Sequence, residues 1–461
     1  MSLGSLLYVG RDSLQTTQMG IDITGANIAN VNTPGYTRQR ALIQSTGGNN
    51  LATGVIQTGV SVEKIERQYD SYLTGQLIIQ RQNTGYATTL NDRLTSVESL
   101  FDETQTGGLT DQLNNFWSAW DTLSGNPSGQ VERGSLVASA QAVAGKLYDL
   151  TNGLTNLKSD VKTSMRDLLE TINTNIEEIR TLNEKIAGTG STKGDTNIML
   201  DQLDSSVGDL GEKIGISYYK NDDGTVNIFL QDGTPLVERL VSSELKLVDN
   251  AGNLELYPEE GIREESLNDT VTNGQMGALL KCQDDVIPEY QDRLDNFTEA
   301  LADGVNAQHR TGYDSFQNTG VDFFTYNSAS PAGSLKVNPA IVSDLRKIAA
   351  AETTNGDGSN ATKIADIQHS LLLEGNSVTL NGYYAATVGN IGREAADSKT
   401  EMEHQSAITE NVTNRRDSLS GVSIDEEMIN LMKYQMTYNA AGRLVKTVND
   451  MMDVLMSLGV K

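Results

Sequence analysis

Cysteine is almost absent from this 461-residue chain, which has only Cys282. A single thiol excludes an internal disulfide framework and any metal site built from several cysteines. No histidine stands near Cys282, so we expect a small apolar residue there rather than a nucleophile. The three histidines, His309, His369 and His404, are widely separated and lack metal-ligand spacing, so we expect each on a solvated or helix-surface position. The sequence therefore predicts no metal centre and no general base.

Positive charge and long apolar runs are also scarce. The chain has 35 Lys and Arg against 61 Asp and Glu, a formal net charge of −26. Nucleic-acid and anionic-membrane binders need a basic surface, so no nucleic-acid partner is expected. No run of eighteen apolar residues occurs, so no membrane span is predicted. The N-terminus lacks the basic start and uninterrupted apolar stretch of a Sec signal peptide, so we predict no Sec export. No Gly-x-Ser-x-Gly elbow occurs, and we predict no enzyme activity, catalytic residue or cofactor.

Aromatic residues make up 5% of the chain and only 7 prolines occur, a composition that suits thin helical layers. Between residues 131 and 186 there is no proline, and apolar residues recur at spacings close to three and four, which predicts a helix roughly 80 Å long. Trp117 and Trp120 lie on or beside the apolar stripe of another predicted helix and are expected in the core. Residues 215 to 262 alternate apolar and polar residues between Asp-Gly and Asn-rich turns, which predicts four to six short strands. The expected fold is mainly α with a small β part: an elongated antiparallel helical rod with a small inserted β-hairpin-rich subdomain.

Each end of the chain carries a heptad-like apolar repeat, and residues 1 to 33 contain just three charges. Both repeats predict amphipathic helices whose apolar faces are covered in an assembly. The residues that we expect at this interface are Leu3, Leu7, Leu14, Ile21, Ile28, Val31, Ile424, Leu431, Tyr434, Tyr438, Ala441, Val445, Val448, Met452 and Leu455. Gly10, Thr17 and Thr24 fill small positions of the first repeat, and Glu427 is the one polar member of the second. The alternative is an ordinary two-helix hairpin packed on the protein's own core.

A turn is predicted between the first helix and the segment that follows. Asparagines tolerate left-handed backbone, and Pro-Gly suits the centre of a type II turn. The predicted turn comprises Asn30, Asn32, Thr33, Pro34, Gly35 and Tyr36. At the other end, Asp425, Glu426 and Glu427 follow Ser423 and are expected to stabilise the first turn of the last helix.

Three segments resemble bacterial flagellar axial proteins: "ANIANVNTPGYTRQR", "GVSVEKIERQYDSYL" and the terminal "GVSIDEEMINLMKYQMTYNAAGRLVKTVNDMMDVLMSL". The Asn-Thr-Pro-Gly-Tyr element is shared by rod, hook and hook-associated proteins. The long helical middle, the small β unit and "VNAQHRTGYD" are similar to the hook-associated protein 1 family, the hook-filament junction proteins. Members often carry a large β-rich insertion after this block, and here the corresponding segment is brief.

The resemblance implies a structural flagellar subunit at the junction of hook and filament, exported by the flagellar type III system and located outside the cell. Its implied partners are copies of itself, hook protein, an adjoining hook-associated protein or filament, and an export chaperone at the C-terminal helix. A hook or rod subunit is the alternative, and a secreted enzyme or adhesin lacks a recognisable site. The expected domains are a terminal coiled-coil assembly domain (1–40 and 422–461), a helical rod domain (41–214, 263–312 and 360–421), a small β subdomain (215–262) and a short irregular insertion (313–359).

Overall fold

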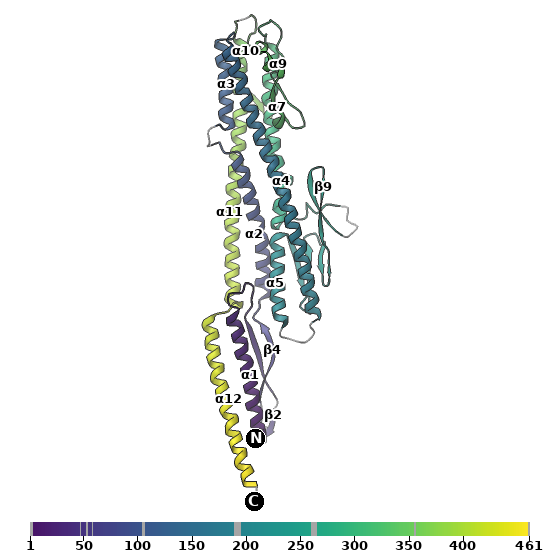
Figure 1. The fold of residues 1–461 in the computed structure, drawn as a ribbon, viewed down its shortest axis with the longest axis vertical. Coiled ribbons are helices and arrows are strands. Elements are labelled where there is room, and N and C mark those ends of the chain that lie inside the picture. Colours follow the sequence, from purple (N-terminus) through teal and green to yellow (C-terminus); the bar gives the residue numbers. More distant parts are fainter. Residues whose placement is uncertain are drawn as a thin grey trace.

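The computed structural model describes residues 3–46, 48–51, 54–57, 59–103, 107–188, 195–259, 265–354 and 356–459. The molecule is elongated, with a pair of terminal helices at one end, a bundle of long helices above them and a small β unit at the side (Figure 1). Helices dominate and the strands form small sheets, so the predicted mainly α fold with a small β part is confirmed.

The terminal unit consists of two long helices and a β ribbon. Helix α1 (Leu3–Ala29) and helix α12 (Ile424–Gly459) run antiparallel side by side, with the N- and C-termini at the same end of the molecule (Figure 1). Strands β1 (Gln39–Ser45) and β4 (Val60–Arg67) pair antiparallel next to α1, and β2 (Gly48–Leu51) pairs with β3 (Gly54–Gln57) at the tip of this ribbon. The domain limits expected from the sequence stay predictions.

The rod unit is built on α4 (Gln130–Gly188), which is unbroken and about 90 Å long at 1.5 Å per residue. The predicted long helix is therefore confirmed. Its apolar stripe is buried against the rest of the bundle. The other helices are α2 (Ser71–Leu100), α3 (Leu109–Gly125), α5 (Asp195–Lys213), α6 (Gly274–Lys281), α7 (Ile287–Thr311) and α11 (Leu380–Ser420). A single π turn, Cys282–Val286, joins α6 to α7, and Cys282 is buried, which raises the pKa of its thiol to about 12.

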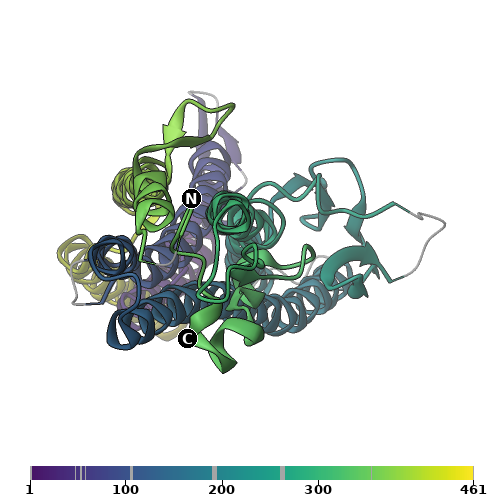
Figure 2. The ribbon, with the colours of Figure 1, turned by 90° about the horizontal axis from the view of Figure 1, so that it is seen from above.

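The β unit lies beside α4 and projects sideways from the bundle (Figure 2). It holds a four-stranded sheet and a hairpin: β5 (Ile216–Lys220), β6 (Val226–Leu230), β7 (Pro235–Glu238), β8 (Val241–Ser242), β9 (Leu245–Asn250) and β10 (Asn253–Pro258). Asn183 of α4 anchors it, because its side-chain amide donates to Val226 O at 2.8 Å and accepts from Val226 N at 2.9 Å. The six strands confirm the predicted number.

The far end of the rod closes with short elements that follow α7. These are β11 (Phe324–Thr325), α8 (Pro331–Ser334), β12 (Lys336–Val337), α9 (Pro339–Ser343), α10 (Ser359–Ala365), β13 (Leu371–Leu373) and β14 (Val378–Thr379). Phe323 packs against Phe116 and Trp120 of α3, with ring centroids 6.2 and 5.2 Å apart. Trp117 and Trp120 are both buried, so their predicted place in the core is confirmed.

The surface position expected for His309 is wrong. Its ring is fully buried beside Phe323 and Trp120. Nδ1 lies 2.5 Å from Val321 O and Nε2 accepts from Ala349 N at 2.9 Å, so the neutral ring satisfies both neighbours. Burial lowers the pKa of His309 to about 4. The polar residues beside it in the sequence concealed this position, because both of its partners come from the segment that follows α7.

Candidate assembly surface and the joint to the rod

Helices α1 and α12 approach closely because two glycines of α1 face large side chains of α12. A Cβ atom at Gly10 would lie 2.5 Å from Val445 Cγ2, and one at Gly20 would lie 2.8 Å from the ring of Tyr434. Real side-chain contacts are never that short, so these positions accept only glycine at this spacing. The seam is therefore set by small residues on α1 and larger ones on α12.

The structure divides the predicted interface residues into three groups by burial. Two are buried: Ala441 and Val448. Nine are partly buried: Leu3, Leu7, Leu14, Ile21, Ile28, Val31, Leu431, Tyr434 and Val445. Four are exposed: Ile424, Tyr438, Met452 and Leu455.

Sequence reasoning missed most of the buried residues of α1. Gly10, Thr17 and Thr24 belong to the predicted repeat and are buried, whereas the predicted interface comprises its larger apolar residues. Gly20 and Asn27 are also buried and lie outside the repeat. A search for small residues at helical spacing, rather than for large apolar ones, finds Gly10, Thr17, Gly20 and Thr24 together.

Much of α12 faces solvent with apolar side chains, and we call this set the open face of α12. Its members have relative exposures from 37% to 73%: Ile424, Met428, Ile429, Met432, Met436, Tyr438, Leu444, Met451, Met452, Val454, Leu455, Met456 and Leu458. So many exposed apolar side chains along one helix are typical of a protein interaction site. The open face is therefore a candidate assembly surface.

The predicted turn reverses the chain after α1, so that β1 runs back alongside this helix. Tyr36 N donates to Thr33 O at 3.2 Å, with Pro34 and Gly35 at the two central positions. Gly35 has a φ of 79°, the left-handed value that the third residue of a type II turn requires. The turn also directs the Tyr36 hydroxyl to Asn27 Oδ1 at 2.9 Å.

A buried polar cluster joins the turn to the start of α12. Glu427, whose side chain is 2% exposed, lies 2.6 Å from Arg38 Nη2 and accepts from Asn27 Nδ2 at 3.1 Å. Arg38 Nη1 donates to Glu426 at 2.7 Å. Explaining Glu426 and Glu427 by helix capping was therefore incomplete, because both also bind Arg38. Burial alone would lower the pKa of Arg38, and the two carboxylates outweigh it and raise the pKa.

A second cluster, the Arg67 joint, connects the terminal unit to α5 of the rod. Arg67 Nη1 donates to Asp201 at 2.6 Å and to Asp204 at 2.9 Å, and its side chain is 6% exposed. Asp201 also accepts from the Thr37 amide at 3.0 Å and from the Thr37 hydroxyl at 2.6 Å. The Arg67 guanidinium lies 4.7 Å from the centre of the Tyr69 ring. The Arg67 joint thus consists of Thr37, Arg67, Tyr69, Asp201 and Asp204.

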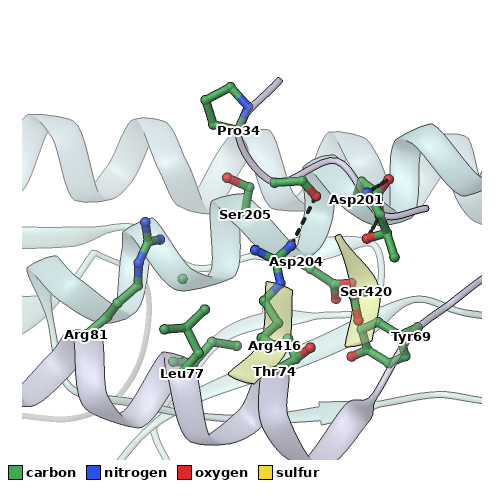
Figure 3. A pocket seen from close by; sticks show the side chains of 14 residues that line it. Pro34, Tyr69, Thr74, Leu77, Arg81, Asp201, Asp204, Ser205, Arg416 and Ser420 are labelled. Carbon is green, nitrogen blue, oxygen red and sulfur yellow. Dashed lines mark hydrogen bonds between the residues drawn. The ribbon is translucent and has the colours of Figure 1, made fainter. Parts of the chain in front are cut away.

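Beside the Arg67 joint lies a cleft of about 110 Å³ between the turn, α2, α5 and the end of α11. Figure 3 shows Arg81 and Arg416 at this cleft, and Arg416 donates weakly to Gly35 O at 3.3 Å. Burial raises the pKa of Tyr36 to about 12, and the charges of Asp201 and Glu427 add to the effect. The turn therefore lies between two acidic groups that are both neutralised by arginine.

Two classes of site do not occur in the part of the chain that the structure describes. No three His, Cys, Asp or Glu side chains are grouped there in a way that could hold a metal ion. No helix among the described ranges combines the length and the apolar character that crossing a membrane requires. The two arginine clusters and the open face of α12 are therefore the candidate functional features among the described residues.

Comparison with known proteins assigns most of the chain. Residues 94–324 match the family model of the flagellar hook-associated protein FlgK helical domain. Residues 7–37 match a model described as flagella basal body rod protein, and residues 416–458 match a model described as flagellar basal body rod FlgEFG protein C-terminal. The two terminal matches cover most of α1 and nearly all of α12.

Relatives match along almost the whole length. The flagellar hook-associated protein 1 of Bacillus subtilis is 28% identical, covering 98% of this chain and 98% of the relative, and that of Salmonella typhimurium is 23% identical, covering 99% and 100%. The structure of the flagellar hook junction protein FlgK from Burkholderia pseudomallei aligns with a TM-score of 0.68 at 16% identity, over 76% of this chain and all of that one. This chain belongs to the family of the flagellar hook-associated protein FlgK.

Proposed function

We propose that this chain is a structural subunit of the bacterial flagellum that forms the junction between hook and filament and assembles through α1 and α12. The single observation that carries this proposal is the open face of α12, which the rest of the chain leaves in water. Family membership supplies the place of the subunit in the flagellum, and the names of the relatives agree with it.

The driving force for assembly is burial of this open face. Covering a half-exposed Met, Leu or Ile side chain contributes roughly 1 kcal/mol, less the entropy of ordering the chain. Methionine suits such a surface because its flexible thioether adapts to several neighbours. The face carries Met428, Met432 and Met436 at a spacing of four, so one stripe of methionines follows the helix. Copies of this chain packed side by side would cover it.

The partners that follow are copies of the chain, hook protein and an adjoining hook-associated protein or filament. Before assembly, the exposed α12 needs protection, which an export chaperone at the C-terminal helix would provide. Export by the flagellar type III system would place the protein outside the cell. The role is mechanical, with no nucleic-acid partner, cofactor or enzyme activity.

A hook or rod subunit is the second candidate, and a specific observation favours it in part. The matches at residues 7–37 and 416–458 are to rod-protein models, since these ends are common to axial proteins. The match at residues 94–324 is to the helical domain of hook-associated protein FlgK, which favours the junction.

Deleting the gene distinguishes the two candidates. A strain without a junction subunit should keep its hooks and release filament protein into the medium, whereas loss of a hook or rod subunit removes the hooks. Electron microscopy of the cell surface and immunoblots of the medium measure both. Cells that lack hooks would contradict the junction assignment.

Complementing that strain with α12 variants tests the assembly surface. Met432→Glu with Met436→Glu places charge on the open face and is expected to abolish filaments while the variant accumulates in the medium. Gln435→Glu is the matched control, since it adds charge at an exposed polar position of the same turn. Full motility with both substitutions would refute the assembly role of the open face.

A truncation tests the same role at a larger scale. Removing residues 1–40 and 422–461 deletes α1 and α12 and is expected to leave a folded, monomeric rod that never incorporates. Circular dichroism and sedimentation check folding and monomeric state, and immunogold labelling of flagella checks incorporation. Incorporation of this truncated chain would contradict an assembly role for α1 and α12.

A further inference from the structure

The two halves of α11 pack against the rod in different ways. In the distal half, the buried residues are mostly apolar or aromatic: Leu380, Tyr383, Tyr384, Thr387, Ile391 and Ala395. In the proximal half, residues 398–420, which leads directly to α12, Ser398 and Ser420 are the buried residues. The proximal half is about six helical turns long, and none of its apolar residues is fully buried. Met402, Ile408 and Val412 are partly buried.

The facing side of α2 is polar as well. Thr84 donates to Gln405 O at 3.3 Å and shares a hydrogen bond of 2.8 Å with Thr409, and Asn91 Nδ2 lies 3.8 Å from Met402 Sδ. Gln80 lies one turn before Thr84 on the same face of α2. Polar residues thus stand where an antiparallel helix pair normally places leucine or isoleucine.

Several buried polar atoms in this seam lack a partner. Among the described residues, Gln80 Oε1, Asn91 Oδ1, Ser398 Oγ and Gln405 Oε1 are buried and have no protein hydrogen-bond partner. An unsatisfied buried acceptor costs free energy relative to water, so opening this seam is favoured by each of these atoms. The apolar stripe of α4 has no such penalty, since Leu147, Leu150 and Leu154 are buried against the core.

The position of the seam gives it a mechanical consequence. The terminal unit meets the rod in two places. At the Arg67 joint, Arg67 binds α5, and β4 continues directly into α2. At the other place, the chain runs from α11 through Gly421 to α12, and Arg38 N donates to Ser420 O at 2.8 Å. Charged hydrogen bonds hold the first link, whereas the polar seam holds the second weakly. A shift of proximal α11 along α2 would turn the terminal helices about the Arg67 joint.

We propose that the proximal half of α11 is a weakly held strut that opens and shifts along α2, so that the terminal helix pair changes its orientation to the rod while the Arg67 joint stays formed. This property belongs to the isolated chain and does not depend on assembly. It gives a junction subunit a built-in means of adapting to neighbours that differ in geometry.

Hydrogen exchange of the full-length monomer tests the opening. Amides of residues 400–418 are expected to exchange about 100-fold faster than those of residues 147–165 in α4, because local opening free energies follow local packing. Asn91→Leu with Gln405→Leu fills the seam with apolar groups and should slow exchange of residues 400–418 at least about tenfold. Asn414→Leu, an exposed substitution on the same helix, is the control for helix propensity.

A distance measurement tests the change of orientation. Spin labels are attached at Ser159→Cys in α4 and Asn439→Cys in α12, in a Cys282→Ser background. Pulsed electron paramagnetic resonance then measures the distance between the two labels, which depends on the orientation of the terminal helix pair to the rod. The distance distribution is expected to be broad and to narrow when Asn91→Leu and Gln405→Leu are added, but not with Asn414→Leu. The proposal is overturned if residues 400–418 exchange as slowly as α4, or if the seam variant behaves like the Asn414 control.

Discussion

Replacing Arg67 by methionine should release the terminal unit from the rod while the far end of the rod stays folded. Arg67 is the only described cation that donates to both Asp201 and Asp204, and the two carboxylate side chains are 8% and 16% exposed. Methionine keeps the bulk of the side chain and removes its charge and hydrogen bonds. Two acidic groups are then left close together with little solvent.

The magnitude follows from the partners that remain. Removing one side of a buried ion pair costs about 3 to 5 kcal/mol. The lower end applies here, because Thr37 still donates twice to Asp201 and Lys220 Nζ lies 3.6 Å from Asp204. A loss of about 3 kcal/mol raises the equilibrium constant for opening of the Arg67 joint by roughly 100-fold.

Two measurements separate local opening from global unfolding. Hydrogen exchange of residues 37–45 and 60–67 should accelerate by that factor in the variant. Urea unfolding followed by tryptophan fluorescence should keep its midpoint, because Trp117 and Trp120 lie at the opposite end of the rod in α3. The reasoning is refuted if the tryptophan midpoint falls as much as the Arg67 joint is destabilised.

Matched variants test whether unpaired charge is the cause. Adding Asp201→Asn and Asp204→Asn to Arg67→Met removes both sides of the pair and should recover most of the lost protection, since neutral groups carry a smaller desolvation cost. Arg310→Met breaks an exposed pair with Asp322 and should change stability by less than about 1 kcal/mol. Equal effects of Arg67→Met and Arg310→Met would contradict the burial argument.

Two further predictions concern His309 and Gly20. The pKa of His309 is about 4 in the folded protein against an ordinary 6.5, so its contribution to the free energy of unfolding is complete above pH 6.5 and falls by roughly 3 kcal/mol as the pH drops towards 4. His309→Gln should therefore flatten the pH dependence of the free energy of unfolding over that range. An unchanged slope would contradict a buried neutral ring. Gly20→Val would force the new side chain into the ring of Tyr434, so α1 and α12 should separate and the amide hydrogens of α1 should exchange faster. Gly25→Val is the control, because no atom lies within 4 Å of its Cβ position, and it should change amide exchange little.

Local pattern was enough to predict most of the helices and strands. The heptad repeats, the long stripe of α4, the Pro-Gly turn and the alternation between residues 215 and 262 each occupy a short stretch of sequence, and each element formed where it was predicted. Hydrophobic spacing over ten to sixty residues determines such elements because the helix and strand periods differ. The resemblance of the terminal segments to axial proteins rested on the same continuous stretches.

The contacts of the candidate site could not be predicted from local sequence patterns and are visible only in the folded chain. Glu427 looked like a polar exception in an apolar repeat, and its partners Asn27 and Arg38 lie about 400 residues away. His309 was placed on the surface because its neighbours in sequence are polar, although its ring bonds to backbone atoms of Val321 and Ala349. No local pattern marks such pairs, because a hydrogen bond requires proximity in space and not in sequence.

The sequence by itself determined that both ends of the chain are amphipathic helices, since spacing alone sets which residues share a helix face. Tertiary structure decided which part of each face is already covered. The glycines of α1 let α12 approach, and this close packing buries the small residues of the seam while the larger apolar side chains of α12 stay in water. A helix repeat fixes the direction of a side chain, but only the arrangement of neighbouring elements determines whether that direction leads to protein or to solvent.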